Sequence, residues 1–344
     1  MKDDKKAAKK VRRQKTALSI LCAFLALVLF VLIFATAFIE NSLLGRVNRV
    51  DINNEETQAS IPTEPTDPSF TGPVVDPEDV EHNTVPGNQV LKDEDVINIL
   101  LVGQDKRPGQ GRQRSDSMIL CSFNLKTGTV SMISFLRDTY VYIPGWGSEK
   151  LNAAYAHGGF GLLFETLAVN FGVGVDAGIE VDFSGFEKII DLLGGVTINI
   201  SQKEADYMKV NWGMTVPVGN TRLNGNQALY YSRIRKLEGG DAMRTQRQRK
   251  VLMSLMNEYK NQPLDEMLDI LYEILPMITT TMSDSEIIRY ARQLFPLLAD
   301  ADVVNQQIPI AGTFTDKTVG TVTATKVIDD MDANRQLLKS LLTN

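Results

Sequence analysis

The chain contains little histidine, and this shortage excludes a common class of catalysis. His82 and His157 are the only histidines among 344 residues. A hydrolase with a Ser-His-Asp triad would have to use His157, and no nucleophile-elbow motif is present. We therefore exclude that class and interpret His157 as a structural residue.

Cysteine is equally scarce, and the two cysteines are placed where they cannot pair. Cys22 lies in a long apolar segment, and Cys121 lies in a predicted strand. A small secreted fold held together by disulfides is therefore excluded. A chain of this length can bury one large core instead. No internal repeat is present, so a solenoid is excluded as well.

The N-terminal part predicts a membrane anchor. Residues 1–16 hold eight basic and two acidic side chains, and residues 17–39 hold no charged side chain. A stretch of that length spans the hydrocarbon core of a bilayer. The positive-inside rule then places the N-terminus in the cytoplasm and the rest outside, as in a single-pass protein of a Gram-positive-type cell membrane. Because Ala35-Thr36-Ala37 resembles a signal-peptide cleavage site, cleavage stays open.

The remainder of the chain divides into a linker and a folded part. The net charge is −6 and the tail contributes +6, so the rest carries −12, which argues against nucleic acid as a partner. Residues 40–95 are rich in proline and acidic side chains, which predicts an extended or disordered linker. We expect residues 96–344 to form one folded extracytoplasmic domain.

Hydrophobic patterning in residues 96–344 predicts helices mixed with strands. Strands are expected at 96–102, 117–124, 129–135, 179–182, 196–200, 304–310 and 321–327, and helices at 161–171, 184–193, 241–260, 264–275, 285–298 and 334–342, with a further helix capped by Asn224. Ser184 and Glu187 have the spacing of a capping box. We expect an α/β fold in which a mixed central β-sheet is flanked by helices on both faces, preceded by one N-terminal transmembrane helix.

Charged residues cluster where these elements begin or end. They are Asp105, Arg107, Arg114, Asp116, Arg137, Asp138, Arg233, Arg235, Asp241, Arg244 and Gln248. Arginine presents a planar fork of donors that fits phosphate, and carboxylates beside such arginines recruit magnesium. The pattern predicts a site for a phosphorylated substrate and a divalent cation. The alternative is that each pair is a surface salt bridge.

These segments resemble the LytR-CpsA-Psr family of cell wall assembly and attenuator proteins from about Ile97 to Val251. The matching stretches include Leu100 to Arg107, Arg114 to Met118, Leu136 to Val141, Lys150 to Tyr155, Gly158-Gly159, Asp191 to Val196, Leu223 to Leu229 and Arg233 to Gln248. Two departures, Gln104 and Phe135-Leu136, remove no charged group.

The resemblance implies a role for each charged residue. Asp105 and Asp116 would hold Mg²⁺, with Mn²⁺ as an alternative ion. Arg107, Arg114, Arg137, Arg233, Arg235, Asp241, Arg244 and Gln248 would bind a pyrophosphate, and Asp105, Asp116, Arg137 and Asp138 would be catalytic. Asp138 and Asp105 are both candidates for the general base, and either could instead orient an arginine. On an extended strand, Arg233 and Arg235 would share one face.

The family also implies the reaction and the partners. Its members move a glycopolymer from a polyprenyl-pyrophosphate carrier in the membrane onto peptidoglycan, so the chain would be a magnesium-dependent transferase for teichoic acid or capsule. A lipid tail needs an apolar channel, and the helices that begin at Gly161 and Ser184 are possible walls, although an ordinary core gives the same pattern. Two alternatives stay open: a non-catalytic polyprenyl-phosphate-binding or regulatory membrane protein, and a polyprenyl-pyrophosphate pyrophosphatase.

Overall fold

The computed structural model describes residues 44–58, 61, 70–82, 84–106, 109–260, 262–294 and 302–343. The predicted basic tail and apolar span lie outside these residues, and so does Arg107. Among the residues described, no helix combines the length and the apolar character needed to cross a bilayer. The division into tail, span, linker and catalytic domain stays a prediction.

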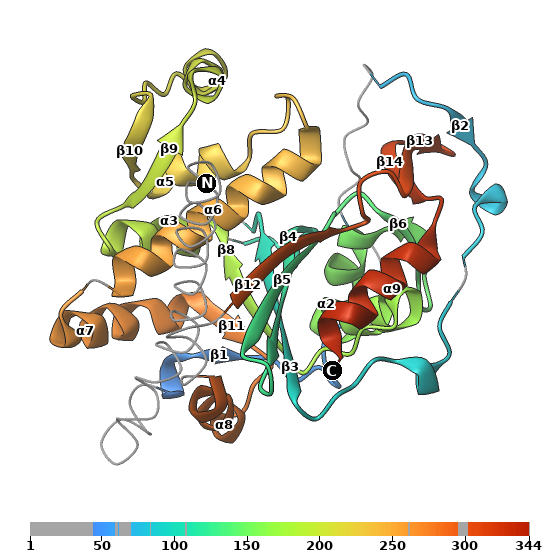
Figure 1. Cartoon of the computed structure of the whole chain (residues 1–344), viewed down its shortest axis with the longest axis horizontal. Coiled ribbons are helices and arrows are strands. Elements are labelled where there is room, and N and C mark those ends of the chain that lie inside the picture. The colour runs from blue at the N-terminus through green and yellow to red at the C-terminus, as the bar shows by residue number, and fades with distance from the viewer. Residues whose placement is uncertain are drawn as a thin grey trace, which may run out of the picture. The chain divides into compact units, whose positions relative to one another are not determined.

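The chain forms two compact units. Figure 1 colours the chain by residue number, from blue at the N-terminus to red at the C-terminus. A strand-rich unit takes in residues 50–126, 131–180 and 305–344, and a helix-rich unit takes in residues 1–49, 127–130 and 181–304. The fold is mixed α/β with a central mixed sheet flanked by helices, as expected.

Five strands of the sheet lie mostly in the strand-rich unit, in the order β8-β3-β4-β5-β12. They are β3 (Val96–Gln104), β4 (Ser115–Asn124), β5 (Thr129–Phe135), β8 (Ala177–Asp182) and β12 (Asp302–Ile308). β3 and β4 are antiparallel, with Leu100 opposite Leu120. Nearly all side chains of β3 and β4 are buried, which explains their continuous apolar sequences.

Smaller elements complete this unit. They are the antiparallel hairpin of β6 (Tyr140–Ile143) and β7 (Gly147–Lys150), a small sheet of β14 (Val322–Ile328), β13 (Phe314–Val319) and β2 (Val74–Val75), the 3₁₀ turns Pro77–Asp79 and Gly87–Gln89, and the helices α2 (Leu151–Phe171) and α9 (Met331–Leu342). The β6–β7 hairpin and β13 were not expected from the sequence.

Helix α2 begins ten residues before the predicted start at Gly161. It continues across a kink at Gly158 and Gly159, where the backbone is not helical. The sequence interpretation treated the glycine pair as a boundary. The helix persists because buried side chains on both sides of the kink, such as Tyr155 and Phe171, pack into one core.

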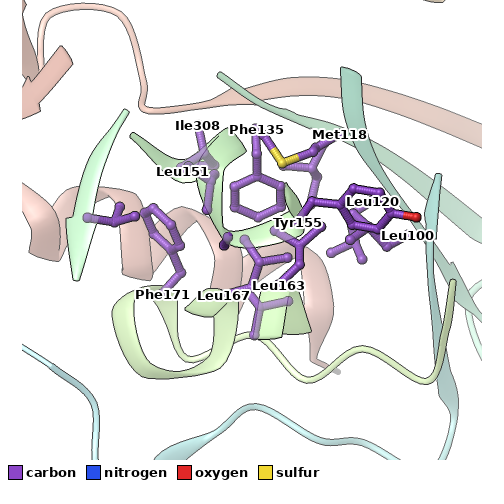
Figure 2. Close-up of a cluster of buried hydrophobic side chains, with 14 of the residues drawn as sticks. Leu100, Met118, Leu120, Phe135, Leu151, Tyr155, Leu163, Leu167, Phe171 and Ile308 are labelled. Atoms are coloured by element: carbon purple, nitrogen blue, oxygen red, sulfur yellow. The ribbon is translucent and has the colours of Figure 1, made fainter. Parts of the chain in front are cut away.

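That core lies between the sheet and α2, as Figure 2 shows. Leu100, Met118 and Phe135 project from the strands toward α2. The rings of Phe135 and Phe171 lie 5.4 Å apart. Helix α9 packs against α2 and β4 and adds Leu338 and Leu342. Burial of large apolar side chains, each stabilising by about 1.5–3 kcal/mol, therefore holds α2 and its N-terminal end in place.

The helix-rich unit has its own core. Its elements are the 3₁₀ turn Leu44–Arg46, β1 (Asn48–Arg49), α3 (Phe183–Leu192), β9 (Val196–Ile200), α4 (Gln202–Trp212), β10 (Gly219–Leu223), α5 (Gly225–Ser232), α6 (Gly240–Lys260), α7 (Leu264–Ile274), the 3₁₀ turn Leu275–Met277, β11 (Ile278–Thr280) and α8 (Asp284–Leu294). β9 and β10 form an antiparallel pair. Ile190, Ile198, Tyr231 and Val251 meet in this core.

Two local predictions in this unit were wrong. Asp182, rather than Ser184, caps α3, because its Oδ1 accepts a hydrogen bond of 2.7 Å from the Gly185 N–H. Arg233 and Arg235 are not on a strand: Arg233 is the C-cap of α5, and Arg235 lies in the turn that leads to α6. Asn224 caps α5 with a full capping box, as predicted.

Candidate functional site

A bulge in the β3–β4 pair positions the first predicted carboxylate. Gly103 pairs with Ser117, and the next residue, Gln104, pairs with Ser115, so Asp116 is the extra residue of β4. A bulge leaves such a residue out of the ladder and redirects its side chain, and bulges are frequent beside active sites. Asp105 follows directly at the end of β3. Both carboxylates therefore flank one irregularity at the end of the hairpin.

Asp116 forms an ion pair with Arg137, which follows β5. Arg137 Nε also lies 3.7 Å from Asp138 Oδ2, and Lys150 Nζ lies 3.3 Å from Asp138 Oδ1. The backbone carbonyl of Arg137 accepts a hydrogen bond of 3.2 Å from the Asn152 N–H at the start of α2. The structure thus brings together three predicted residues, Asp116, Arg137 and Asp138.

Arg114 belongs to a second group in the same unit. Its Nη2 lies 2.6 Å from Glu149 Oε1, and its Nη1 donates to Asn152 Oδ1 at 3.2 Å. The other carboxylate oxygen of Glu149 lies 3.2 Å from His157 Nε2. His157 is buried, which agrees with a structural role. The Glu149 carboxylate nevertheless connects it to Arg114, a predicted phosphate ligand.

The sequence interpretation missed three of these partners as site residues: Glu149, Lys150 and Asn152. The signal was available, because Lys150 and Asn152 belong to one of the stretches that match the family. The sequence interpretation assigned no role to that stretch, because its predicted helix began only at Gly161. The short β6–β7 hairpin that delivers Glu149 and Lys150 was not recognised either.

The remaining predicted residues lie in the helix-rich unit. Asp241 Oδ1 lies 2.9 Å from Arg244 Nη2 and 3.4 Å from Arg235 Nη2. Arg244 and Asp241 are almost completely buried. The Arg233 guanidinium lies over the ring of Phe183, 5.1 Å from its centroid. Gln248 lies on α6, four residues after Arg244. That these residues converge with those of the strand-rich unit stays a prediction.

Arg247, also on α6, has a structural partner. Its Nε donates to Glu204 Oε1 at 2.8 Å, and both side chains are buried. Burial alone would raise the pKa of Glu204. Hydrogen bonds from the Ser201 backbone and from Arg247 outweigh burial and lower that pKa below its ordinary value. Arg247 therefore joins α6 to α4, whereas Arg244 faces Asp241.

A magnesium site would rest on few protein ligands. Among the described residues, no group of three or more His, Cys, Asp or Glu side chains is arranged to hold a metal ion. Asp105 and Asp116 flank the bulge and offer hard oxygen donors. Such a pair suits Mg²⁺, which keeps several waters and takes further ligands from substrate phosphates.

The side chains proposed as walls of a lipid channel belong to the cores. Leu163 and Leu167 of α2 are fully buried, with Leu162 and Phe164 packed against them. Ile189 and Ile190 of α3 belong to the second core. A pocket of about 310 Å³ lies at the C-terminal end of α2, and its lining includes Thr84, Gln89, Phe171, Arg335, Gln336 and Lys339. The lining is mixed, because Val85, Pro86 and Leu91 lie beside these polar and charged side chains.

The fold and the arginine–carboxylate groups define the chain as a mixed α/β protein with paired charges beside the ends of its strands. The model of the LytR_cpsA_psr family matches residues 53–337, and the chain belongs to that family. It is 36% identical to "Regulatory protein MsrR" of Staphylococcus aureus (strain COL) over 258 residues, which is 74% of this chain and 77% of that protein.

Other relatives carry more specific names. The chain is 41% identical over 178 residues to "Polyisoprenyl-teichoic acid--peptidoglycan teichoic acid transferase TagU" of Oceanobacillus iheyensis, covering 50% of this chain and 54% of TagU. Among solved structures, "TagT bound to LI-WTA" has a TM-score of 0.59 at 28% identity, covering 76% of this chain and 97% of TagT. A structure of YwtF (TagT) "with bound octaprenyl pyrophosphate lipid" has a TM-score of 0.57 at 26% identity, with coverages of 76% and 97%.

Proposed function

We propose that the chain is a membrane-anchored, extracytoplasmic phosphotransferase that moves a glycopolymer from a polyprenyl-pyrophosphate carrier onto peptidoglycan with Mg²⁺. The observation that carries the proposal is the Asp116–Arg137–Asp138–Lys150 group beside the β3–β4 bulge. The names of TagU and of the lipid-bound TagT structure support the same substrate class.

The reaction is a transfer of the phosphate that carries the glycopolymer. A hydroxyl oxygen of peptidoglycan attacks that phosphorus, the bond from phosphorus to the bridging oxygen breaks, and polyprenyl phosphate leaves. The proton of the hydroxyl passes to a base. Phosphoryl transfer depends mostly on positioning and charge stabilisation. A bound Mg²⁺ would neutralise charge on the phosphate oxygens, held by Asp105 and Asp116.

The cationic side chains of the chain itself would stabilise the remaining negative charge on the phosphate. Arg114 and Arg137 would bind equatorial phosphate oxygens, where preformed donors stabilise the transition state. Asp138 contacts two cations, Arg137 and Lys150, so it suits the task of orienting Arg137. The general base stays open between Asp138 and Asp105, and an Asp105 that holds Mg²⁺ is a poor base.

The test is a transfer assay with the full chain in detergent, a polyprenyl-pyrophosphate glycan, peptidoglycan fragments and Mg²⁺. We expect a phosphodiester-linked product. Arg137→Ala should lower its rate by roughly 10- to 1000-fold, the scale seen when a transition-state donor is removed. Lys126→Ala is the matched control, because its ion pair with Asp95 is exposed. Full activity in Arg137→Ala would count against the proposal.

A regulatory or lipid-binding role is the second candidate, because a relative of similar length is named as a regulatory protein. In that case the full chain would bind the polyprenyl-pyrophosphate glycan without forming product. Release of glycan phosphate and polyprenyl phosphate with water in place of an acceptor would instead identify a pyrophosphatase.

A further inference from the structure

His157 lies between two hydrogen-bond acceptors. Its Nδ1 lies 3.1 Å from the backbone carbonyl oxygen of Gln58, and its Nε2 lies 3.2 Å from Glu149 Oε2. The ring is buried, with 7% of the side chain exposed, so water cannot easily replace either partner. A neutral imidazole has one N–H and would leave one of these acceptors facing a lone pair.

Only the imidazolium form donates to both neighbours. The ring of Trp146 supports the same form, because it stacks on the imidazole at 4.0 Å with an angle of 18° between the planes. An aromatic face attracts a cation. The geometry therefore favours a charged His157 beside the Glu149 carboxylate.

Glu149 connects this ring to the candidate site. One carboxylate oxygen contacts His157 and the other lies 2.6 Å from Arg114 Nη2. While His157 is charged, the single negative charge of Glu149 is shared between two cations, and Arg114 keeps positive charge for an anion. When His157 is neutral, Glu149 neutralises Arg114 alone and competes with the phosphate.

We propose that His157 is a positioning residue whose protonation, through Glu149, sets the affinity of Arg114 for pyrophosphate. This rests on the proposed function in that Arg114 is taken as a phosphate ligand. Affinity is then high when His157 is protonated and falls when His157 loses its proton.

Other charged groups surround the ring and must be held constant. The β6–β7 hairpin brings Glu149 and Lys150, the segment before β4 brings Arg112 and Arg114, and the segment before Gln58 brings Glu55 and Glu56. On α9, Arg335 binds the Asn170 carbonyl at the far end of α2. Lys150 pairs with Asp138, and Arg112 pairs with Glu55. Glu149 contacts His157 directly.

The protonation state can be observed directly, because the chain has only two histidines. The full chain is labelled with ¹⁵N-histidine, purified in detergent with a tag that lacks histidine, and assigned with His82→Gln. The ring nitrogens of His157 report its protonation state at each pH from 5.5 to 8, and we expect the affinity for pyrophosphate to follow the fraction of the imidazolium form. In Glu149→Gln this correspondence should be lost. A neutral His157 at pH 5.5 in the parent would overturn the proposal.

Binding of inorganic pyrophosphate, measured calorimetrically from pH 5.5 to 8, tests the coupling. The dissociation constant of His157→Gln divided by that of the parent should be about three- to tenfold at the pH values where the ring nitrogens show a charged His157, and near one where they show a neutral ring. The titration of pyrophosphate cancels in this ratio. His82→Gln should give a ratio of one throughout, and Glu149→Gln should bind with the pH dependence of the coupling removed.

The alternatives give different results. A ratio that is the same at every pH would mean that His157 only supports the fold, and would overturn the proposal even though Arg114→Ala weakens binding. If Arg114→Ala binds pyrophosphate as well as the parent, Arg114 is not a phosphate ligand, and the role assigned to it in the proposed function fails together with the inference.

Discussion

At the scale of single residues, ion pairs with carboxylates hold the arginines of the candidate site in place. Glu149 holds Arg114, Asp116 and Asp138 hold Arg137, and Asp241 holds Arg244. An arginine fixed in this way loses little side-chain entropy when it binds phosphate. The carboxylates would therefore hold the arginines ready for an anion, and Glu149 would do so for Arg114 while it shares its charge with His157.

A buried carboxylate near this site has a different effect on stability. Glu55 is almost completely buried, and its Oε2 accepts a hydrogen bond of 3.0 Å from the Gly161 N–H. Burial raises the pKa of Glu55, and the hydrogen bond and Arg112 only partly offset it. A raised pKa in the folded state means that stability present below the unfolded-state pKa is lost as pH rises through the folded-state pKa.

We therefore expect Glu55→Gln to melt at a higher temperature than the parent at pH 7. The neutral amide keeps the hydrogen bond and avoids the buried charge. At pH 4, where the carboxyl is largely protonated in both states, the two proteins should melt alike. Thermal unfolding followed by circular dichroism at both pH values checks this. A variant that melts lower than the parent at pH 7 would show that the Arg112 ion pair outweighs burial.

At the scale of elements, the kink in α2 depends on Gly159. Its φ is +61°, in the left-handed region that favours glycine, and a Cβ there would collide with the Glu55 carboxylate. The kink separates the N-terminal part of α2, which carries Asn152 and His157, from the C-terminal part, which carries Leu163 and Phe171.

Gly159→Ala should therefore destabilise the fold by about 1–3 kcal/mol, from backbone strain and crowding together. Gly128→Ala is the matched control, because Gly128 has a similar φ of +69° and open space around it. Its cost should be close to 1 kcal/mol, the strain alone. Denaturant unfolding measures both, and equal losses would mean that Glu55 moves aside without cost.

The contact of α6 with α4 through Arg247 and Glu204 gives another prediction. Arg247→Met should lower the free energy of unfolding by about 3 kcal/mol, because it leaves the buried Glu204 carboxylate without its cation. Replacing both residues, with Glu204→Gln added, should recover part of that loss. Urea unfolding of the single and double variants decides this, and a loss below 1 kcal/mol would mean that water reaches Glu204.

The elements that the sequence predicts well have strong local signals. The apolar run of β3, the cap at Asn224 and the paired glycines after α3 each match the structure within a few residues. α4 was missed although Ser201 and Glu204 form a capping box. The β6–β7 hairpin was missed because its strands have only four residues each, and packing on α2, a tertiary contact, stabilises them.

The candidate site was predictable in its residue types more than in its contacts. Asp116, Arg137 and Asp138 lie together as a chain of ion pairs, but the bulge that turns Asp116 is set by pairing with β3 and has no sequence signal of its own. Glu149 was missed for a related reason. Its role comes from two partners that are distant in sequence, Arg114 and His157.

At the scale of the whole molecule, the segment after the predicted span is part of the helix-rich unit. Leu44 and Val47 are buried, and β1 pairs with β11 in parallel, with Asn48 opposite Thr279. Arg49 also forms an ion pair with Asp284. These contacts belong to residues that the composition alone assigned to the linker.

Two truncations should therefore behave differently. Removing residues 1–39 should release the protein from the membrane fraction and leave its melting temperature unchanged. Removing residues 1–49 also deletes β1 and Leu44, and should cost about 2 kcal/mol or more, since burying one leucine contributes that amount. Fractionation and thermal unfolding check the two effects. A soluble, equally stable 50–344 protein would show that β1 contributes nothing.

The burial of Leu44 also limits how far the helix-rich unit can lie from a bilayer. If the span ends at Ile39, five residue steps connect it to Leu44, and a fully extended chain covers at most about 3.6 Å per residue. Leu44 would then stay within about 18 Å of the membrane surface. Such a short connection keeps the part of the unit around Leu44 close to the lipid surface, where the pyrophosphate of a polyprenyl carrier would also lie.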